Sequence, residues 1–278
     1  MAFARRGDRV YATMRGIAGK NAENASYLTK IAADESIDLR VLELDVLDTA
    51  SVNAAAEVVN AESGAADVVI NNAGVMYVGL TEAFDEQELA RQLDVNVVGV
   101  HRVSRAFLPA MRAKKSGLMI NVSSVAGRMA IPFFGVYQAS KWAVEGYSAG
   151  LRLDLASSGV DVVLVEPGPF KTELFGQSPA PADKDGRGAT YPQALHDSYA
   201  AMNSSFEGIF GDPDAPTDPG LVVDQFIALT DMTPGTRPVR VAVGLDFGVR
   251  ALNDARVEFD AGVLSAMGMT EVTTLATS

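Results

Sequence analysis

Residues 117–141 read GLMINVSSVAGRMAIPFFGVYQASK, and this stretch decides how the rest of the chain is interpreted. Its apolar start, residues 117–122, has the composition of a buried strand, and Ser123 and Ser124 follow at the carboxyl end of that strand. In open parallel sheets this end forms the ligand crevice. A Gly/Pro-containing loop then leads to Tyr137 and Lys141, which begin a helical pattern. Side chains four residues apart lie on one helix face, so the phenol and the ammonium can reach the same space.

This set of side chains is suited to proton transfer. A free tyrosine has a pKa of about 10, and a neighbouring ammonium favours its phenolate form. We therefore expect Lys141 to lower the pKa of Tyr137, so that the phenol can donate or accept a proton near neutral pH.

The composition excludes several classes of protein. Hydrophobic residues make up 48% of the 278 residues and charged residues 21%, which excludes wholesale disorder. The net charge of −12 leaves no basic stripe for nucleic-acid phosphates, and the absence of cysteine excludes disulfides and thiolate-bound zinc. No apolar run approaches the roughly 18 residues of a membrane span. We expect a soluble, cytoplasmic protein without a metal site.

Strand-like and helix-like segments alternate along the chain. The opening residues 1–6 resemble the last turns of a helix that ends at Gly7, and Asp48 or Thr49 is a suitable N-cap. Pro109 is expected to end or kink the long helical region. This alternation predicts one α/β domain over residues 1–278, a Rossmann-like doubly wound parallel sheet with helices on both faces. Strands are expected at 9–13, 39–44, 67–71, 117–122, 160–165 and 238–243, the strand at 67–71 being buried on both faces; helices are expected at 22–34, 49–63, 84–115, 136–158, 193–206, 221–230 and, mixed in kind, 247–267.

Residues 176–219 contain six prolines, and a long loop-rich insertion after a strand end is commonly a substrate-covering segment. Aromatic side chains in and around it favour a bulky, apolar substrate. Residues 270–278 are expected to fray. The aromatic candidates for the pocket are Phe133, Phe134, Phe170, Phe175, Tyr191 and Phe206.

Further motifs in the same order complete a resemblance. Asn71, Asn72, Ala73 and Gly74 follow the strand at 67–71, Asn96 lies in the next helix, and Tyr137 comes 13 residues after Ser124. Pro167, Gly168 and Thr172 follow the strand at 160–165. From residue 9 to about residue 172 the chain resembles the classical short-chain dehydrogenase/reductase family, with a weaker similarity to its 17β-hydroxysteroid and retinol dehydrogenase subgroup.

The resemblance implies hydride transfer between a nicotinamide dinucleotide and an alcohol/carbonyl pair. It implies that Tyr137 is the acid/base, that Ser124 bonds the substrate oxygen, that Lys141 bonds the nicotinamide ribose, and that Asn96 holds a relay water. Asp45 and Val46 would meet the adenine, and Asn72, Ala73 and Gly74 would lie under the adenosine ribose. Pro167, Gly168 and Thr172 would hold the nicotinamide end. A homodimer or homotetramer is implied by the same analogy.

Arg15 bears on the choice of cofactor. It follows the strand at 9–13, where an acidic residue would bond the ribose 2′-hydroxyl of NAD, and a cation there suits the 2′-phosphate of NADP. We therefore favour NADP(H), with NAD(H) as the alternative.

The resemblance also predicts a first strand and a glycine-rich, pyrophosphate-binding loop ahead of Met1. Neither is present in the 278 residues, and in the order 3-2-1-4-5-6 that strand is central. Its absence predicts two halves of a sheet with unpaired edges. Either the true start lies upstream of Met1, in which case the enzyme hypothesis stands, or the chain is an N-terminally truncated, non-catalytic relative that binds cofactor poorly or acts through a partner surface.

Simpler explanations exist for several of these residues. Asn96 could satisfy a nearby backbone group, Asp45 could cap a turn, and Arg15 could be an ordinary surface cation. His101 and His196 have no metal-like spacing and are expected to be packing or surface residues.

Overall fold

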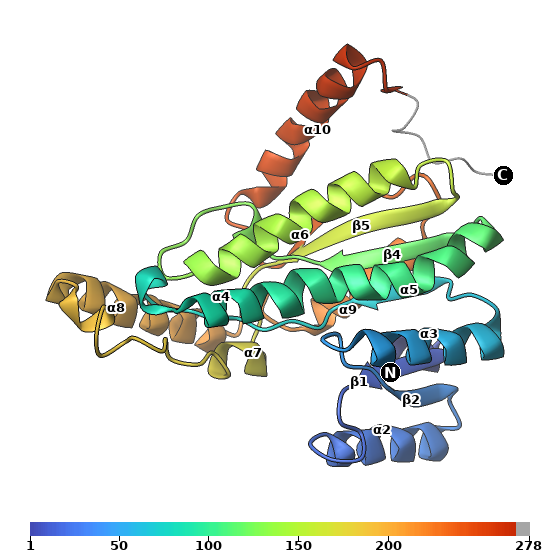
Figure 1. Cartoon of the computed structure of the whole chain (residues 1–278), viewed down its shortest axis with the longest axis horizontal. Coiled ribbons are helices and arrows are strands. Elements are labelled where there is room, and N and C mark those ends of the chain that lie inside the picture. The colour runs from blue at the N-terminus through green and yellow to red at the C-terminus, as the bar shows by residue number, and fades with distance from the viewer. Residues whose placement is uncertain (271–278) are drawn as a thin grey trace.

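The computed structural model describes residues 1–270, in which strands form two parallel sheets flanked by helices (Figure 1). The smaller sheet pairs β1 with β2, and the larger one has the order β3-β4-β5-β6. Every pairing is parallel, as expected where helices connect successive strands. The predicted Rossmann-like class is confirmed. The strands are β1 (Val10–Met14), β2 (Leu39–Glu43), β3 (Val68–Asn71), β4 (Gly117–Val122), β5 (Val160–Pro167) and β6 (Arg240–Val243).

Ten α-helices connect and cover these strands in the part of the chain that the structure describes, together with four short turns of other helix types. The α-helices are α1 (Ala2–Arg5), α2 (Ala22–Glu35), α3 (Thr49–Ser63), α4 (Glu86–Leu93), α5 (Gly99–Lys114), α6 (Gly135–Asp154), α7 (Glu173–Gly176), α8 (Gln193–Gly211), α9 (Gly220–Asp231) and α10 (Val249–Ala266). The short turns are η1 (Thr81–Ala83), η2 (Asp94–Val98), η3 (Val125–Gly127) and η4 (Gly188–Thr190), of which η2 is a π-turn.

The larger sheet is covered on both faces because its side chains alternate between two apolar clusters. Met119 of β4 packs with side chains of α3, α5 and α6 on one face. Its neighbours Leu118 and Ile120 pack with Phe226 and Leu229 of α9 on the other face. The period of two along β4 therefore places helices on both sides of the sheet.

β1 and β3 are edge strands without a second partner strand among the described residues, as are β2 and β6 at the opposite edges. β1 pairs only with β2, and β3 pairs only with β4. The sequence predicts a strand between these two edges, and none of the described residues forms one. The two sheets are joined instead by side chains, since Val52 and Val59 of α3 belong to a cluster that includes Tyr11 of β1 and Val69 of β3.

The unpaired edge makes one prediction wrong. β3 is not buried on both faces: Val69 and Asn71 are buried, whereas Val68 and Ile70 are only half-buried. A strand with a neighbour on one side only leaves part of its apolar surface open, whatever its composition.

Three helix predictions also need correction. Pro109 neither ends nor interrupts α5, which continues to Lys114; the interruption of the long helical region is the π-turn η2, which contains Asn96. α6 ends at Asp154 rather than at residue 158, and turns then lead to Gly159. Residues 249–266 form a single helix, α10, rather than a mixed one.

The remaining boundaries follow the sequence closely. α3 spans the predicted residues, and the Asp48 side chain caps it by accepting a hydrogen bond from the Ala50 N–H at 2.8 Å. The predicted helix at 193–206 extends to Gly211 as α8. α8 lies at one end of the molecule and α2 lies at the other side, beneath β1 and β2 in this view, while α10 projects away from the body (Figure 1). The predicted fraying of the tail concerns residues 271–278, which lie outside the described residues, and Thr270. No helix within residues 1–270 is long and apolar enough to cross a membrane.

Candidate active site

The carboxyl end of β4 and the first turn of α6 bring the hydroxyl, the phenol and the ammonium together. Ser124 follows β4 and caps the turn η3, where its Oγ accepts a hydrogen bond from the Ala126 N–H at 3.1 Å. The Ser124 hydroxyl also lies 3.4 Å from the carbonyl oxygen of Pro167, at the end of β5. Two strand ends and one capped turn therefore fix the position of this hydroxyl.

Ser123 differs from its neighbour although the two residues are adjacent. Its Oγ is buried without a hydrogen-bond partner, and it points toward Gly127, whose added Cβ would lie 2.7 Å from it. Ser124, in contrast, has hydrogen-bond partners and acts on the Tyr137 phenol in the direction that lowers its pKa. The spacing argument that selects Ser124 therefore agrees with the geometry.

Tyr137 is buried, and its pKa does not move in the direction expected from the sequence. Burial raises the pKa of Tyr137 to about 12, which outweighs the lowering by Ser124. The expectation that Lys141 lowers this pKa is wrong for the protein without bound cofactor. Lys141 Nζ lies over the face of the phenol ring, 5.7 Å from its centroid, rather than against the hydroxyl. Removing the phenol from water disfavours its charged form, so Tyr137 is protonated at neutral pH.

Lys141 is equally buried and donates a hydrogen bond of 2.8 Å from Nζ to the carbonyl oxygen of Val122, at the end of β4. Burial lowers the pKa of Lys141 to about 8, and the charge of Glu145 acts in the opposite direction. An ammonium has three donors. The bond to Val122 therefore leaves donors of Lys141 available to a ligand.

Asn96 has its side chain committed to the backbone. Its Oδ1 accepts from the Val75 N–H at 2.9 Å, and its Nδ2 donates to the Val75 carbonyl at 2.9 Å and to Ser140 Oγ at 3.0 Å. The structure thus gives this side chain the simpler role considered from the sequence, that of satisfying backbone groups. Gly74 packs directly against it, since an added Cβ would lie 3.3 Å from Asn96 Oδ1. The relay water stays a prediction.

In the motif at residues 71–74, only the first residue is buried. Asn71 is buried, and its Nδ2 donates to Asn121 Oδ1 at 2.8 Å; Asn121 in turn donates to Ser148 Oγ of α6 at 2.8 Å. Asn72, Ala73 and Gly74 are exposed. Buried amides tie β3, β4 and α6 together, while the predicted ribose-contacting residues lie open at the strand end.

Pro167 and Gly168 end β5 beside the site. A Cβ on Gly168 would lie 2.0 Å from the carbonyl oxygen of Leu245, so only glycine allows this close approach of two backbones. Thr172 is exposed and precedes α7. Its predicted contact with the nicotinamide end stays a prediction.

The predicted adenosine-side residues lie on the smaller sheet. Arg15 is exposed directly after β1, and the loop that follows it is held by Glu43, which accepts hydrogen bonds from the N–H groups of Gly16 and Ile17 at 2.6 and 2.8 Å. Asp45 Oδ1 accepts from the Leu47 N–H at 3.0 Å, so it caps a turn, as the simpler explanation predicts. Val46 is half-buried, and its carbonyl oxygen accepts a hydrogen bond from Arg102.

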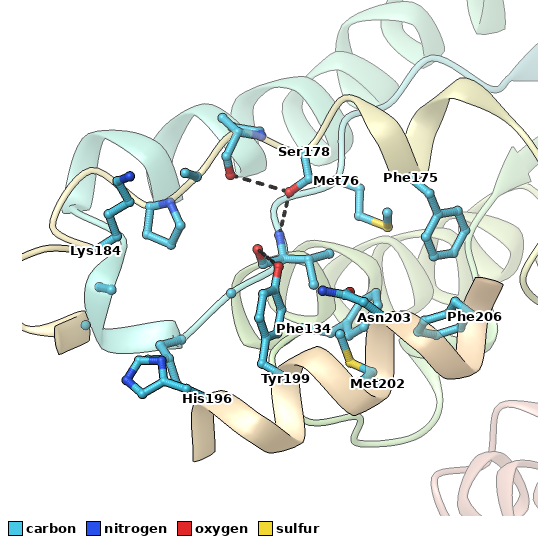
Figure 2. Close-up of a pocket in the computed structure, with 18 of the residues that line it drawn as sticks. Met76, Phe134, Phe175, Ser178, Lys184, His196, Tyr199, Met202, Asn203 and Phe206 are labelled. Carbon is cyan, nitrogen blue, oxygen red and sulfur yellow. Dashed lines mark hydrogen bonds between the residues drawn. The ribbon is translucent and has the colours of Figure 1, made fainter. Parts of the chain in front are cut away.

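An apolar cavity of about 710 Å³ lies between the loop that follows β3 and the segment from α7 to α8. Figure 2 shows Tyr199, Met202 and Phe206 of α8 directed toward it from one side and Met76 from the other. Ser178 Oγ accepts a hydrogen bond of 2.9 Å from the Val78 N–H, which joins the two walls (Figure 2). Most of the covering residues come from the predicted segment at 176–219.

The aromatic predictions for this cavity are partly wrong. Phe134, Phe175 and Phe206 line it, and Phe133 supports its wall by packing edge-on against Tyr199 with ring centroids 5.1 Å apart. Phe170 belongs instead to the core between the sheet and α9, because it follows β5 directly and turns inward there. Tyr191 bonds Glu82 on the surface through its hydroxyl at 2.8 Å.

The cavity and the proton-transfer residues are adjacent but separate. Ser124, Tyr137 and Lys141 are not among the residues that line the cavity. Phe134 lies between the cavity and the proton-transfer residues, because it lines the cavity and packs against Tyr137 with ring centroids 6.3 Å apart. Tyr137 also shares an apolar cluster with Met76 and Val78.

Comparison with known proteins places this site in a family. A family model described as short chain dehydrogenase matches residues 1–182, which contain all the predicted catalytic and cofactor-binding residues. The chain belongs to the short chain dehydrogenase family. A solved short-chain dehydrogenase from Streptomyces avermitilis is 30% identical, with a TM-score of 0.68 over 96% of this chain and 92% of that one.

Two curated relatives resemble this short chain dehydrogenase over part of their length. A 3-ketodihydrosphingosine reductase of Bacteroides thetaiotaomicron is 42% identical over 154 residues, 52% of this chain and 57% of the relative. The human 17-beta-hydroxysteroid dehydrogenase type 1 is 42% identical over 167 residues, 60% of this chain and 50% of the relative. The chain thus matches little more than half the length of these relatives.

The sequence contains a further signal for the cavity, in the segment that forms α8. Leu195, Tyr199, Met202 and Phe206 recur at spacings of four, three and four residues and form an apolar stripe on α8. Their spacing shows that the segment at 176–219 contains a helix whose apolar face turns toward the cavity. The histidine prediction stays untested: His196 lines the cavity, and His101 Nδ1 lies 3.1 Å from the Tyr147 hydroxyl.

Proposed function

We propose that this chain is an NADP(H)-dependent oxidoreductase that interconverts a secondary alcohol and a carbonyl on an apolar substrate. The observation that carries the proposal is that the buried phenol of Tyr137 has the Lys141 ammonium over its ring and Ser124 close enough to act on its pKa. A protonated phenol and a second hydroxyl can bind one substrate oxygen together.

The residue roles follow from their protonation states. Because burial raises the pKa of Tyr137 to about 12, the phenol carries its proton at neutral pH and serves as the acid that protonates a carbonyl oxygen. Ser124 holds that oxygen, and Lys141, with its lowered pKa and remaining donors, binds the ribose end of the cofactor. A bound nicotinamide supplies or accepts the hydride. Asn96 positions the loop at Val75, and in this proposal it also holds a relay water.

The smaller sheet supports the choice of NADP(H). Glu43 fixes the loop that follows Arg15 through two backbone hydrogen bonds, so the backbone that carries this exposed cation is held at the end of β1. Asp45, Val46 and the exposed residues Asn72, Ala73 and Gly74 belong to the adenosine side in the same proposal, and Pro167, Gly168 and Thr172 to the nicotinamide side. A guanidinium suits a 2′-phosphate because it can donate two parallel hydrogen bonds.

The substrate is expected to be apolar and bulky. The cavity beside Tyr137 is lined mainly by apolar residues, its large side chains being mostly Met, Phe and Leu, and its volume of about 710 Å³ lies in the range of pockets for drug-sized ligands. The names of the two relatives, one for a sphingoid ketone and one for a steroid, point in the same direction.

Turnover of wild-type and Tyr137→Phe protein tests the proposal. The substrates are ketosteroids, retinoids and simple aldehydes, each assayed with NADPH and with NADH. We expect NADPH oxidation with an apolar ketone, and a loss of about 10²–10⁴-fold in Tyr137→Phe, the usual contribution of a general acid. Tyr147→Phe, on the same helix but paired with His101, is the matched control and should retain activity. Equal turnover of wild type and Tyr137→Phe contradicts the role of the phenol.

The unpaired edges of β1 and β3 favour a second candidate function, a non-catalytic relative that binds cofactor poorly. NADPH titration by fluorescence distinguishes the two. Saturable binding by the 278-residue chain supports the enzyme, whereas no saturable binding supports the second candidate. If the 278-residue chain does not bind NADPH, a longer chain that supplies a strand between β1 and β3 is tested next. The enzyme proposal predicts that this longer chain binds NADPH.

A further inference from the structure

Behind the active site, a buried cluster of charged residues joins α6, β5, β6 and α10. Glu145 lies one helical turn after Lys141 on α6, and Glu166 is the penultimate residue of β5, directly before Pro167. Both carboxyl groups are almost completely buried, at 3% and 0% exposure of the residue. Two buried acids beside a catalytic lysine are unusual, because carboxylates are rarely buried unless they are paired.

The two acids share one arginine. Arg240 Nε lies 2.8 Å from Glu145 Oε2 and 3.8 Å from Glu166 Oε1. Arg128 approaches Glu166 Oε1 only to 3.6 Å, and its Nε instead donates to Asn253 Oδ1 of α10 at 3.0 Å. Glu145 therefore has a close cation, whereas both cations lie farther from Glu166 than a hydrogen bond reaches.

One oxygen of each acid has no hydrogen-bond partner. Glu145 Oε1 and Glu166 Oε1 are both fully buried and unpartnered, while Glu166 Oε2 accepts a hydrogen bond from Asn253. An ionised carboxylate can only accept, so two ionised carboxylates cannot satisfy each other. A proton on one of them removes the charge of that carboxyl group, and the cost of a buried, unpartnered charged oxygen favours that proton.

We propose that Glu166 holds a proton at neutral pH while Glu145 stays ionised, and that this pair positions the charge of Lys141. Glu145 is the ionised member because Arg240 is in hydrogen-bond contact with it, and Glu166 is the acid whose Oε1 lacks such a partner. The titratable groups that face the pair are Arg128 before α6, Arg240 on β6 and Lys141 on α6. Neither acid touches the substrate, so both are positioning residues.

The pKa directions agree with this assignment. Burial and the charge of Glu145 raise the pKa of Glu166 to about 8. The charge of Glu145 also raises the pKa of Lys141, against the lowering by burial. Because the charge of Glu145 acts on both groups, the protonation of Glu166 and that of Lys141 are linked. The consequence for catalysis rests on the proposed function, whereas the protonation states do not.

Nuclear magnetic resonance of the whole 278-residue chain tests the pair without any turnover. With ¹³C at the glutamate side-chain carboxyl and ¹⁵N at the lysine Nζ, we expect one glutamate to titrate about three units or more above the ordinary value near 4.3. Glu166→Gln should remove that titration. Glu145→Gln should lower the Glu166 midpoint and the Lys141 midpoint by about one unit each, since it removes one neighbouring negative charge.

Glu258→Gln, an exposed acid on α10, is the matched control and should leave both midpoints unchanged. Wild-type protein alone already decides the first point if a variant fails to fold. Titration of every glutamate below about pH 5, as expected if a buried water satisfied two ionised carboxylates, overturns the proposal. An unchanged Lys141 midpoint in folded Glu145→Gln overturns it as well.

Kinetics adds a separate readout. In Glu145→Gln the alkaline limb of the kcat/KM profile with NADPH should move to lower pH with Lys141, and Glu145→Asp should restore part of the shift. Loss of turnover in wild type, with the predicted titrations intact, contradicts the proposed function and not the carboxyl pair.

Discussion

The two sheets of this chain differ in how completely they are buried. Four of the six residues of β4 and seven of the eight residues of β5 are buried, and these strands have neighbours on both sides. In β1 no residue is buried, β2 buries only Leu39, and α2 buries none. The predicted proton-transfer residues belong to the larger sheet and its connections. Arg15 and Asp45 follow the strands of the smaller sheet. The chain therefore contains one well-packed half and one that is held mainly by α3.

The difference shows that packing depends on neighbours as much as on composition. The apolar residues of β1, such as Val10 and Tyr11, suit a strand as well as those of β4 do. They stay half-buried because β1 has one partner strand instead of two. The precise positions needed for proton transfer are available where strands are flanked on both sides.

The largest expected effect compares core residues of the two halves. Ile120→Ala, at 0% exposure in β4, should lower the free energy of unfolding by about 2–5 kcal/mol, because it leaves a cavity in a close-packed core. Val41→Ala, half-buried in β2, should cost about 1 kcal/mol or less. Urea denaturation of both variants measures the two values. Similar losses would show that the two halves are packed alike.

Within the well-packed half, the two adjacent serines should differ in how much their replacement lowers kcat. Ser124→Ala should lower kcat by about 10²-fold, as loss of one donor to a reacting oxygen does elsewhere. Ser123→Ala removes a buried, unpartnered hydroxyl and should leave kcat nearly unchanged. Steady-state kinetics with NADPH and an apolar ketone measures both, and equal losses would remove the basis for preferring Ser124.

The pH dependence of stability should change sign near pH 8. The raised pKa of Glu166 means that between its usual value of 4.5 and about 8 the folded chain keeps a proton that the unfolded chain has lost, so stability falls with rising pH. The lowered pKa of Lys141 means that between about 8 and 10.5 the unfolded chain holds the extra proton, so stability rises again.

Each of these two groups can change the free energy of unfolding by at most about 1.4 kcal/mol per pH unit. Thermal unfolding at pH 6, 8 and 9.5 measures the sign. Glu166→Gln should remove the decline between pH 6 and 8, and a wild-type stability that rises steadily through this range would contradict the assignment.

The smallest expected effect concerns the loosely packed half. Arg15→Ala should raise the KM for NADPH by about tenfold, the loss of one charge-assisted hydrogen bond of moderate strength, and leave the KM for NADH unchanged. Lys20→Ala, an exposed cation in the same loop, is the control. If Arg15→Ala raised the KM for NADPH and for NADH equally, Arg15 would be an ordinary surface cation and would not bind the 2′-phosphate.

Most of the fold could be predicted from the sequence because local patterns determine it. The strand composition of β4 and β5, the N-cap Asp48 and the spacing of Tyr137 and Lys141 are all visible in short windows, and each was confirmed as an element or a placement. The exposure of Val68 could not be read in this way, because it depends on which strands lie beside β3. The π-turn at Asn96 likewise has no sequence signature comparable to a proline.

The side-chain chemistry of the site was harder to predict than its location. The pKa of Tyr137 depends on how completely α6 and η3 remove the phenol from water, and that burial is a property of the packed structure. The pairing of Glu145 with Arg240 joins residues that are 95 positions apart. Short-range spacing arguments cannot detect such a pair.

Hydrogen exchange of the wild-type chain tests the difference between the halves most directly. Exchange is measured at backbone amides by mass spectrometry of peptides that cover β1, β2, β4 and β5, without substrate or cofactor. Amides of β4 and β5 should exchange only through global unfolding, and those of β1 and β2 should exchange about 10²-fold faster or more, through local opening. Equal protection of the two sheets would contradict the account.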